Sequence, residues 1–216
     1  MRLKNIPGSR ETIEASPLVL SDHEALLEMP GKWNDFFGNG NPICLEIGMG
    51  KGQFILENAV RNPGINYIGV EKYSSVIVRA LEKRSGYEGR NLIFVRMDAE
   101  EIASVFGEGE VSKIFLNFSD PWPKERHAKR RLTSELYWGR YDRILVPGGH
   151  VVMKTDNTGL FRFSLEEGDR CGWDTGRHTF DLYHSEYLEG NIPTEYEDKF
   201  RNLGQKICYM DAERKG

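Results

Sequence analysis

The sequence predicts an α/β fold, doubly wound, with a mostly parallel sheet of about seven strands and helices on both faces. From residue 43 onward, short apolar runs alternate with segments of helical periodicity. This alternation is typical of right-handed strand–helix–strand crossovers, which build parallel sheets. At 216 residues the chain is long enough for one such domain and too short for two. We therefore expect one domain over residues 41–216, preceded by a basic extension over residues 1–40.

The first forty residues show no sustained periodicity and are rich in Pro and Gly. Arg2, Lys4 and Arg10 make the beginning basic, with no acid among the first ten residues. A short helix is expected near residues 21–29, with Ser21 as its N-cap. The extension is thus predicted to consist of a flexible basic start, one short helix and a loop.

The main domain is predicted from its apolar runs and the helical patterns between them. Five buried strands are expected over residues 43–47, 67–71, 92–95, 114–118 and 150–154. Helices are expected over residues 52–61, 74–85, 99–106 and 132–145, the last of which ends before Pro147-Gly148-Gly149. The pattern then weakens, and a helix over 159–169 and two strands over 179–184 and 206–211 complete the prediction.

Composition excludes several classes of protein. No run of about 18 apolar residues is present, so no membrane-spanning helix is expected, and no apolar segment follows the first residues as in a signal peptide. Cys44, Cys171 and Cys208 are far apart and odd in number. This argues against a disulfide framework and a zinc site. We expect a cytoplasmic protein without a metal.

The charge is unevenly distributed. The net charge is -4, which by itself does not favour a nucleic-acid partner, but net charge says little about local potential. The segment Lys124–Arg131 contains five Lys or Arg among its eight residues. A charge run is usually a solvated surface. Here it directly follows the end of a predicted strand, where a bound polyanion would reach a site at that edge.

Acidic residues stand at or just after the end of each of the five predicted strands. In doubly wound sheets, ligands bind beyond the carboxyl ends of the strands. A single acid there is explained well as a helix N-cap, but five on one edge predict a ligand site. They are Glu46, Glu71, Asp98, Asp120 and Asp156.

The first strand is followed by glycines at alternate positions, Gly48, Gly50 and Gly52, which allow the backbone to approach a ligand closely. Gln53 breaks the dinucleotide fingerprint, and Lys51 is not followed by Ser or Thr as in a phosphate-binding loop. An acid such as Glu71 can accept hydrogen bonds from a ribose diol. A pocket surrounded by acids suits a cationic or neutral ligand, and S-adenosylmethionine fits that field.

The segment Asp120-Pro121-Trp122-Pro123-Lys124 is the most specific one in the sequence. Two prolines around a tryptophan are expected to fix the backbone in an extended geometry and to prevent a helix. The alternative is a purely structural turn with Trp122 in the core. We interpret the segment as a rigid loop that presents Asp120 and Trp122.

With these motifs the sequence resembles the bacterial tRNA (guanine-N7-)-methyltransferases, within the Rossmann-like class of S-adenosylmethionine-dependent enzymes. The resemblance covers most of the chain. The glycine motif after Glu46 is shared with many methyltransferases, whereas the Asp-Pro-Trp-Pro-Lys run and the late Thr-x-Tyr-Glu element are far more specific. Ser119 departs from the family, which often has proline there. The matching elements are Glu46–Gly52, Asp120–Lys124, Lys154–Asp156 and Thr194–Glu197.

The resemblance implies a role for each matching position. Cofactor-binding residues would be Glu46, Gly48, Gly50, Glu71, Asp98 and Asp120, with Asp120 also the catalytic carboxylate. Contacts to the target nucleoside would come from Lys124, Asp156, Thr194, Glu195, Tyr196 and Glu197. RNA would be bound by Arg126, His127, Lys129, Arg130 and Arg131. The implied target is the guanine at position 46 in the variable loop of tRNA, methylated by a monomer or a homodimer away from membranes.

Three alternatives remain open at this point. A methyltransferase acting on an exocyclic base amine would carry Asp or Asn followed by Pro-Pro and an aromatic residue, and Trp122 replaces the second proline. A nicotinamide-dependent dehydrogenase is disfavoured by Gln53 and by the lack of an obvious hydride-transfer acid. A non-catalytic RNA-binding module would leave the strand-end acids without a purpose.

Overall fold

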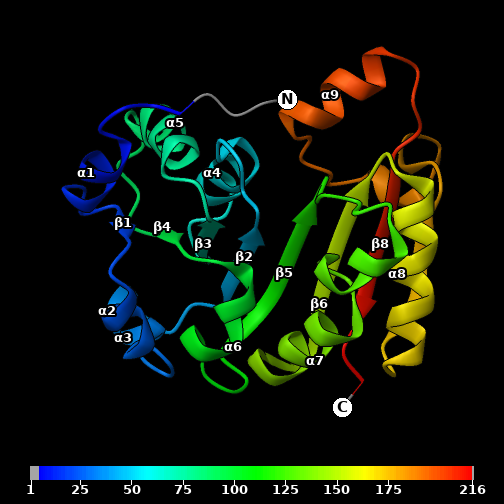
Figure 1. The fold of residues 1–216 in the computed structure, drawn as a ribbon, viewed down its shortest axis with the longest axis horizontal. Helices are drawn as coiled ribbons and strands as arrows, with labels where there is room; N and C mark the ends of the chain where they lie inside the picture. Colours follow the sequence, from blue (N-terminus) through cyan, green and yellow to red (C-terminus); the bar gives the residue numbers. More distant parts are fainter. Residues whose placement is uncertain (1–4, 216) are drawn as a thin grey trace.

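A computed structural model describes residues 5–215, so the basic residues Arg2 and Lys4 lie outside the described part. Figure 1 shows a central sheet with helices on both faces, which confirms the doubly wound α/β fold. The strands are β1 (Val19–Leu20), β2 (Ile43–Ile47), β3 (Asn66–Glu71), β4 (Leu92–Arg96), β5 (Val111–Asn117), β6 (Leu145–Thr155), β7 (Asp174–Thr179) and β8 (Cys208–Glu213).

The strand order is β1-β4-β3-β2-β5-β6-β8-β7. Strands β1 to β6 pair in parallel, and β8 runs antiparallel to both β6 and β7. The five central strands lie where the apolar runs predict them. The sheet has eight strands among the described residues, against about seven expected, because the two-residue β1 adds an edge beside β4.

The helices between the strands form two layers. On one face α4 (Gln53–Arg61) and α5 (Ser74–Arg84) pack with α1 (Ser9–Glu14). The other face is covered by α2 (His23–Leu27), α3 (Trp33–Phe37), the 3-10 helix η1 (Ala99–Glu101), α6 (Ile102–Val105), α7 (Glu135–Ile144) and α8 (Thr158–Arg170). Helices therefore shield both faces of the parallel strands from solvent, as is usual for parallel sheets.

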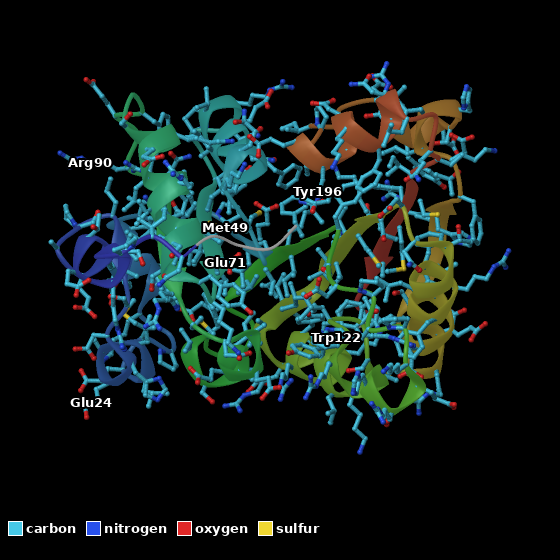
Figure 2. All side chains as sticks on the ribbon, turned by 45° about the horizontal axis from the view of Figure 1, so that its top comes forward. Glu24, Met49, Glu71, Arg90, Trp122 and Tyr196 are labelled. Carbon is cyan, nitrogen blue, oxygen red and sulfur yellow. The ribbon has the colours of Figure 1, made fainter. Side chains whose placement is uncertain are left out.

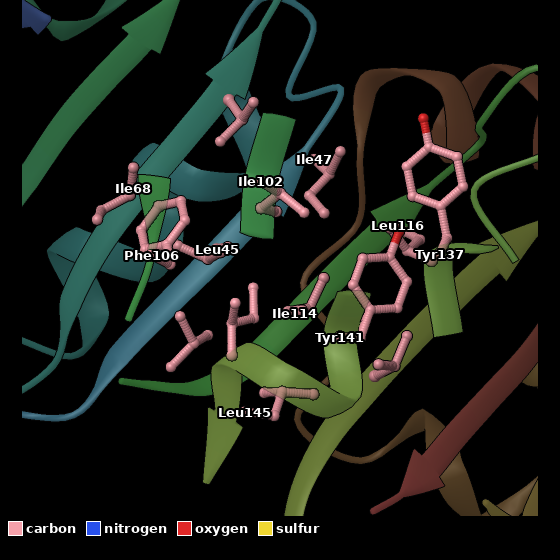
Figure 3. Close-up of a cluster of buried hydrophobic side chains, with 14 of the residues drawn as sticks. Leu45, Ile47, Ile68, Ile102, Phe106, Ile114, Leu116, Tyr137, Tyr141 and Leu145 are labelled. Carbon is pink, nitrogen blue, oxygen red and sulfur yellow. The ribbon is translucent and has the colours of Figure 1, made fainter. Parts of the chain in front are cut away.

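The larger core lies between the second layer and the sheet. Figure 3 shows Ile114 of β5 next to Tyr141 of α7, with Leu45 of the adjacent strand β2 beside Phe106, and Leu45, Ile114 and Tyr141 are fully buried. Burying a large apolar side chain contributes about 1.5–3 kcal/mol. With the hydroxyl of Tyr141 donating to the carbonyl of Leu132 at 2.8 Å, this core fixes the strand ends from which the functional residues project.

The N-terminal segment is more ordered than the sequence predicts. It forms α1, β1, α2 and α3 instead of one helix and loops, and the N-cap of α2 is Asp22, not Ser21. The Asp22 carboxylate accepts from the backbone amide of Ala25 at 3.2 Å. Ile13 and Trp33 are fully buried. Isolated apolar residues in a polar segment give no periodicity, so only their tertiary contacts fix these elements.

The C-terminal part also differs from the prediction. The strand expected over 179–184 lies earlier, as β7, and residues 182–184 form a 3-10 helix with Leu182 fully buried. An additional helix, α9 (Glu195–Asn202), lies above the carboxyl ends of β5 and β6 in Figure 1. The periodicity analysis missed it because its eight residues contain few apolar side chains.

Cys44, Cys171 and Cys208 are all free thiols. Within residues 5–215 no helix has the length and apolar character needed to cross a membrane.

Candidate active site at the carboxyl ends of the strands

The strand order reverses between β2 and β5, which are neighbours in the sheet. Crevices at such a switch point are where doubly wound folds bind ligands. The topology brings the five predicted acids to this edge, because each lies at or just after the carboxyl end of a parallel strand from β2 to β6. Figure 2 shows Met49 and Glu71 close together, with Trp122 and Tyr196 across the sheet from them.

Glu46 is the most buried of these acids. Its Oε1 accepts from the side-chain amide of Asn117 at 2.8 Å, whereas Oε2 is buried without a partner among the described residues. Burial raises the pKa of Glu46 to about 8, although the bond from Asn117 and the charge of Lys154 act in the opposite direction. Leaving a buried acceptor unpaired costs about 1–3 kcal/mol. A hydrogen-bond donor at Oε2 would offset this cost.

The glycine loop has a backbone that other residues rarely adopt. Gly48 and Gly50 have φ angles of 74° and 56°, in the left-handed region that favours glycine. A Cβ added at either would meet nothing within 4 Å, so the space beside the loop is open. The amides of Gly48 and Met49 both donate to the carbonyl of Val70, at 2.9 and 3.1 Å. The loop is thus tied to the end of β3 and leaves room for a ligand.

Glu71, at the end of β3, holds the same loop from the other side. Its Oε1 accepts from the amides of Lys72 and Tyr73 at 2.8 and 3.0 Å, and its Oε2 accepts a longer bond of 3.3 Å from Gly50. Burial raises the pKa of Glu71, the backbone bonds lower it, and the charge of Asp120 raises it further. Glu71 therefore lies within electrostatic reach of Asp120 and keeps acceptor capacity on Oε2.

Asp98 is the N-cap of η1, so the N-cap explanation for the acids at the strand ends applies to one of its two oxygens. Its Oδ1 accepts from the amide of Glu100 at 3.1 Å as the cap of η1, and its Oδ2 accepts from Lys72 Nζ at 2.5 Å. Burial acts to raise the pKa of Asp98, but these two bonds and the Lys72 charge outweigh it, so the pKa lies below its usual range. The Lys72 side chain is mostly exposed and can turn away from Asp98 when a ligand approaches.

Asp156 follows β6 and is half-buried. The N-cap role at this strand end falls to Asn157, whose side chain accepts from the amide of Leu160 at 2.8 Å. The capping explanation for an acid at this position therefore does not apply to Asp156.

In the loop after β5 the prediction of an extended backbone is wrong. Phe118 and Trp122 have φ angles of 52° and 41°, the only positive values for residues other than glycine within 5–215. Such strain persists only where surrounding contacts fix it, and it clusters at functional sites. Asp120 is exposed at the centre of this loop and has no hydrogen bond or ion pair to residues 5–215 in the structure. Its carboxylate is therefore free to meet a substrate.

The contacts that fix the loop come from the basic run. Arg131 donates from Nε to the carbonyl of Pro121 at 3.2 Å and from Nη2 to that of Trp122 at 3.1 Å, and its guanidinium lies 4.2 Å from the centre of the Phe163 ring. Trp122 is half-buried, with the Arg130 guanidinium 4.9 Å from its ring centre. Arg131, expected to bind RNA, thus supports the loop. This supporting role could not be predicted, because the backbone partners of Arg131 cannot be read from a charge run.

The rest of the basic run is open to solvent. It forms the 3-10 helix η2 (Glu125–Arg130), in which Arg126 and Lys129 are exposed, as is the preceding Lys124. These three cations have no acidic partner within the described part of the chain. His127 is half-buried, with its ring 5.8 Å from that of Trp122 in an edge-on arrangement.

The Thr-x-Tyr-Glu element forms the start of α9. Thr194 and Glu197 make a reciprocal capping box, in which the Glu197 amide donates to the Thr194 hydroxyl at 3.0 Å. Glu197 is completely buried and pairs with Lys154 of β6 at 2.6 Å. Glu195 instead lies at the surface, where it pairs with Lys83 and Lys51. The four residues expected to contact the nucleoside therefore do not share one environment.

Tyr196 remains available for a ligand, being 47% exposed. Its ring centre lies 6.1 Å from that of Phe118 and 5.5 Å from that of Phe200. Sequence reasoning assigned no role to Phe118, to Asn117 or to the side chain of Lys154. A lysine that ends the apolar run of β6 was the one available signal, since a buried cation requires a buried partner.

Residues 5–215 contain no group of three or more His, Cys, Asp or Glu side chains arranged to hold a metal ion.

Comparisons with known proteins show what the chain is similar to. A family model described as "Putative methyltransferase" matches residues 40–210. A tRNA (guanine-N(7)-)-methyltransferase of Lachnoclostridium phytofermentans is 58% identical over 214 residues, covering 99% of this chain and 99% of that protein. Among solved structures, an antibiotic-related methyltransferase has a TM-score of 0.61 at 15% identity and covers 86% of this chain and 94% of its own. The 16S rRNA methyltransferase KamB has a TM-score of 0.58 at 12% identity, with coverage of 86% and 94%.

Proposed function

The chain belongs to the tRNA (guanine-N(7)-)-methyltransferase family, and on that premise we propose that it transfers the methyl group of S-adenosylmethionine to N7 of a guanine in tRNA. One observation supports this most: Asp120, exposed and without a hydrogen bond or ion pair to residues 5–215, lies in the loop between β5 and the exposed cations of η2, and the adjacent strands β2 and β3 carry the buried acids Glu46 and Glu71. The acidic residues suit a small cationic methyl donor, and the basic residues suit a polyanionic methyl acceptor. Asp120 would then lie close to both.

The residues of the first three strand ends fit S-adenosylmethionine. Glu46 precedes the open glycine loop by two residues, and a ligand N–H donor would satisfy its Oε2, which has no partner among the described residues. Glu71 Oε2 keeps acceptor capacity for a ribose hydroxyl, and Asp98 lies one strand further along the same edge. We infer that Glu46, Glu71 and Asp98 hold the cofactor, with Gly48 and Gly50 providing the space for it.

S-adenosylmethionine, when bound, supplies a methyl group on a sulfonium that leaves as a neutral thioether. Guanine N7 carries an in-plane lone pair, so no side chain has to remove a proton before it attacks. The protein has to hold the two reactants in line, and such positioning supplies up to roughly 7–11 kcal/mol in well-oriented reactions. Catalysis is therefore proposed to depend on rigid placement of the guanine, which the strained loop after β5 favours.

Asp120 is the proposed catalytic residue. Its carboxylate accepts hydrogen bonds from guanine N–H groups and stabilises the positive charge that methylation creates on the purine. Because Asp120 is not used in any internal bond within residues 5–215, this interaction breaks no existing contact. Lys124 and Asp156 are proposed to complete the nucleoside subsite from the two sides of the edge.

The tRNA backbone is proposed to lie along the exposed side of η2, where Arg126, Lys129 and Arg130 would contact phosphates. N7 faces the deep major groove of an A-form helix, which side chains do not enter easily. The target is therefore a loop nucleotide, and we propose guanosine 46 of the variable loop. Its tRNA substrate favours the cytoplasm as the place where the protein works.

The test is to incubate unmodified tRNA transcripts with labelled S-adenosylmethionine and to map the product. We expect label in N7-methylguanosine and strand cleavage at position 46 after borohydride and aniline treatment. A transcript with adenosine at position 46 is the matched control and should take up no label. Label without cleavage would instead favour methylation of an exocyclic amine, and transfer to the control transcript would refute the assignment of the target nucleotide.

A further inference from the structure

Lys154, the last residue but one of strand β6, has an ammonium group that hardly reaches solvent, since only 2% of the side chain is exposed. Its Nζ donates to Glu197 Oε2 at 2.6 Å, to Asn191 Oδ1 at 3.0 Å and to the carbonyl of Ile192 at 2.8 Å. All three acceptors belong to the segment that leads into and begins α9. The lysine therefore fixes one end of α9 to the centre of the sheet.

Glu197 uses both carboxylate oxygens for internal bonds. Oε1 accepts from the hydroxyl of Tyr183 at 2.8 Å and from the side-chain amide of Asn191 at 2.7 Å. Oε2 accepts from Lys154 and, at 3.3 Å, from the amide of Thr194. Four donors occupy the lone pairs of a side chain with no exposed surface, so no acceptor position remains for a nucleoside.

The same Lys154 also holds the loop after β5. Its backbone carbonyl accepts from the amide of Phe118 at 2.8 Å, at the residue whose φ angle is 52°. Its side chain meanwhile holds Glu197, the neighbour of Tyr196 on α9. The Phe118 and Tyr196 rings, 6.1 Å apart, thus come from two segments that are both anchored to one residue.

These rings stand next to the cofactor acids. Asn117 precedes Phe118 and donates to Glu46, and the Lys154 charge acts on Glu46 as well. Figure 1 shows α9 above the arrowheads of β5 and β6, at the edge where the acids gather. Aromatic faces at such a place are suited to hold a planar base by stacking.

We propose that Lys154 and Glu197 are positioning residues, whose buried pair sets α9 so that Tyr196 and Phe118 form one aromatic wall for the target guanine. Neither residue of the pair touches the nucleoside. Phe118 is on this view a further nucleoside-binding residue, which the family motifs do not identify. The inference rests on the proposed function for the identity of the base, but not for the role of the pair in holding α9.

The test compares Glu197→Gln, Lys154→Met and the double variant of both with Asp198→Asn, which removes one exposed acid from the same helix. Hydrogen exchange of the peptide covering residues 195–202 is measured together with single-turnover methylation and cofactor binding. We expect faster exchange and an about 100-fold lower turnover in the single variants, since misplacement by about 1 Å costs that much. Affinity for tRNA should stay at the wild-type value in every variant, and cofactor affinity should do so in Glu197→Gln, which keeps the Lys154 charge that acts on Glu46. Asp198→Asn should behave as wild type.

The double variant carries no unpaired buried charge, so it should recover slow exchange and most of the turnover. One further variant keeps the proposal testable if a single variant folds poorly: Tyr196→Ala should lower turnover without changing exchange in α9.

Reduced turnover in Glu197→Gln with wild-type exchange would overturn the proposal, because it would indicate a direct contact with the nucleoside. Equal defects in the double and single variants would do the same. If wild type methylates no tRNA guanine, the proposed function is wrong, whereas the exchange measurements still decide whether the pair holds α9.

Discussion

The edge of the sheet at the carboxyl ends of the strands has two halves, the ends of β2, β3 and β4 and the ends of β5 and β6 with α9 above them (Figure 1). The buried carboxylates Glu46 and Glu197, one in each half, differ in how many hydrogen bonds they accept. Glu46, on β2, has one oxygen without a partner among the described residues, and its pKa is raised by burial. Glu197, on α9, has four donors on its two oxygens. The Glu46 oxygen without a partner indicates a position for a ligand, whereas the carboxylate of Glu197, whose acceptor positions are all used, stabilises the fold.

The two halves also differ in charge. The ends of β2, β3 and β4 present Glu46, Glu71 and Asp98, while the loop after β5 leads into the exposed cations of η2. Asp120 lies at the boundary. This division suggests that the cofactor and the RNA are bound by separate sets of residues, and that substitutions in one half leave the other ligand unaffected.

The largest effect is expected at the boundary itself. Asp120→Asn keeps the shape of the side chain but removes the charge that stabilises the methylated purine, so turnover should fall about 100-fold or more. The affinity for tRNA should change little, because the phosphate contacts lie on η2. Single-turnover rates measure the effect, with Glu125→Gln, an exposed acid nearby, as the control. Wild-type rates in Asp120→Asn would reduce Asp120 to a residue of the turn.

The acidic half is tested most directly at Glu71. Glu71→Ala removes acceptors for the ribose and should weaken cofactor binding by about 1.5–3 kcal/mol, roughly 10- to 150-fold. Affinity for tRNA should stay the same. Calorimetry with each ligand separately gives both numbers. Glu71→Gln should show a smaller loss of cofactor affinity because its amide oxygen can still accept from the backbone, and an unchanged cofactor affinity in Glu71→Ala would contradict the assignment.

The basic half is tested by the salt dependence of tRNA binding. Replacing Arg126, Lys129 and Arg130 by alanine should flatten the slope of log K against log salt by about 2 to 3, if each contacts one phosphate. Cofactor affinity should not move. A matched triple variant of Arg61, Arg79 and Arg90, on other surfaces (Figure 2 labels Arg90 far from Trp122), should keep the wild-type slope. Equal slopes in both triple variants would mean that η2 has no part in docking.

The smallest expected effect is the release of a proton from Glu46 when the cofactor binds. Its pKa is raised from 4.5 to about 8 by burial, so the folded protein holds a proton between these values that the unfolded chain releases. The contribution of Glu46 to stability is therefore largest below pH 4.5 and declines as the pH rises toward 8. A bound cation next to Glu46 should favour the carboxylate, and cofactor binding at neutral pH should release part of that proton.

Calorimetry of cofactor binding in phosphate and in Tris, which differ in ionisation enthalpy, measures this release. Glu46→Gln should bind with the same heat in both buffers. Equal heats in the wild type would show that Glu46 does not change its protonation state when the cofactor binds.

The central sheet could be predicted because its signal is local. The runs that become β2 to β6 are short, apolar and separated by helical patterns, and a parallel strand has to be apolar on both faces. The five acids could be located for the same reason, since the end of each strand can be read from the sequence. The acids gather at one edge because strands joined by crossover connections run parallel, and parallel strands have their carboxyl ends at the same edge of the sheet.

Other features depend on partners far away in the chain. Trp33 gives no pattern of its own, yet it is fully buried and its indole donates to the carbonyl of Val105 at 3.0 Å. The strand β1 exists only because Val19 and Leu20 pair with Phe94 and Val95 of β4. A propensity-based analysis cannot predict elements of two or five residues that are stabilised by tertiary contacts.

The roles within the site divide in the same way. Local pattern is enough to locate the residues at the strand ends, and the family motifs indicate the chemistry. That Arg131 supports the Trp122 loop, and that Glu197 is saturated by donors as distant as Lys154, 43 residues away, follows from the folded arrangement alone. The physical reason is that a charged side chain binds a ligand or stabilises the fold according to the donors and acceptors around it, and folding brings those together from positions that no local pattern connects.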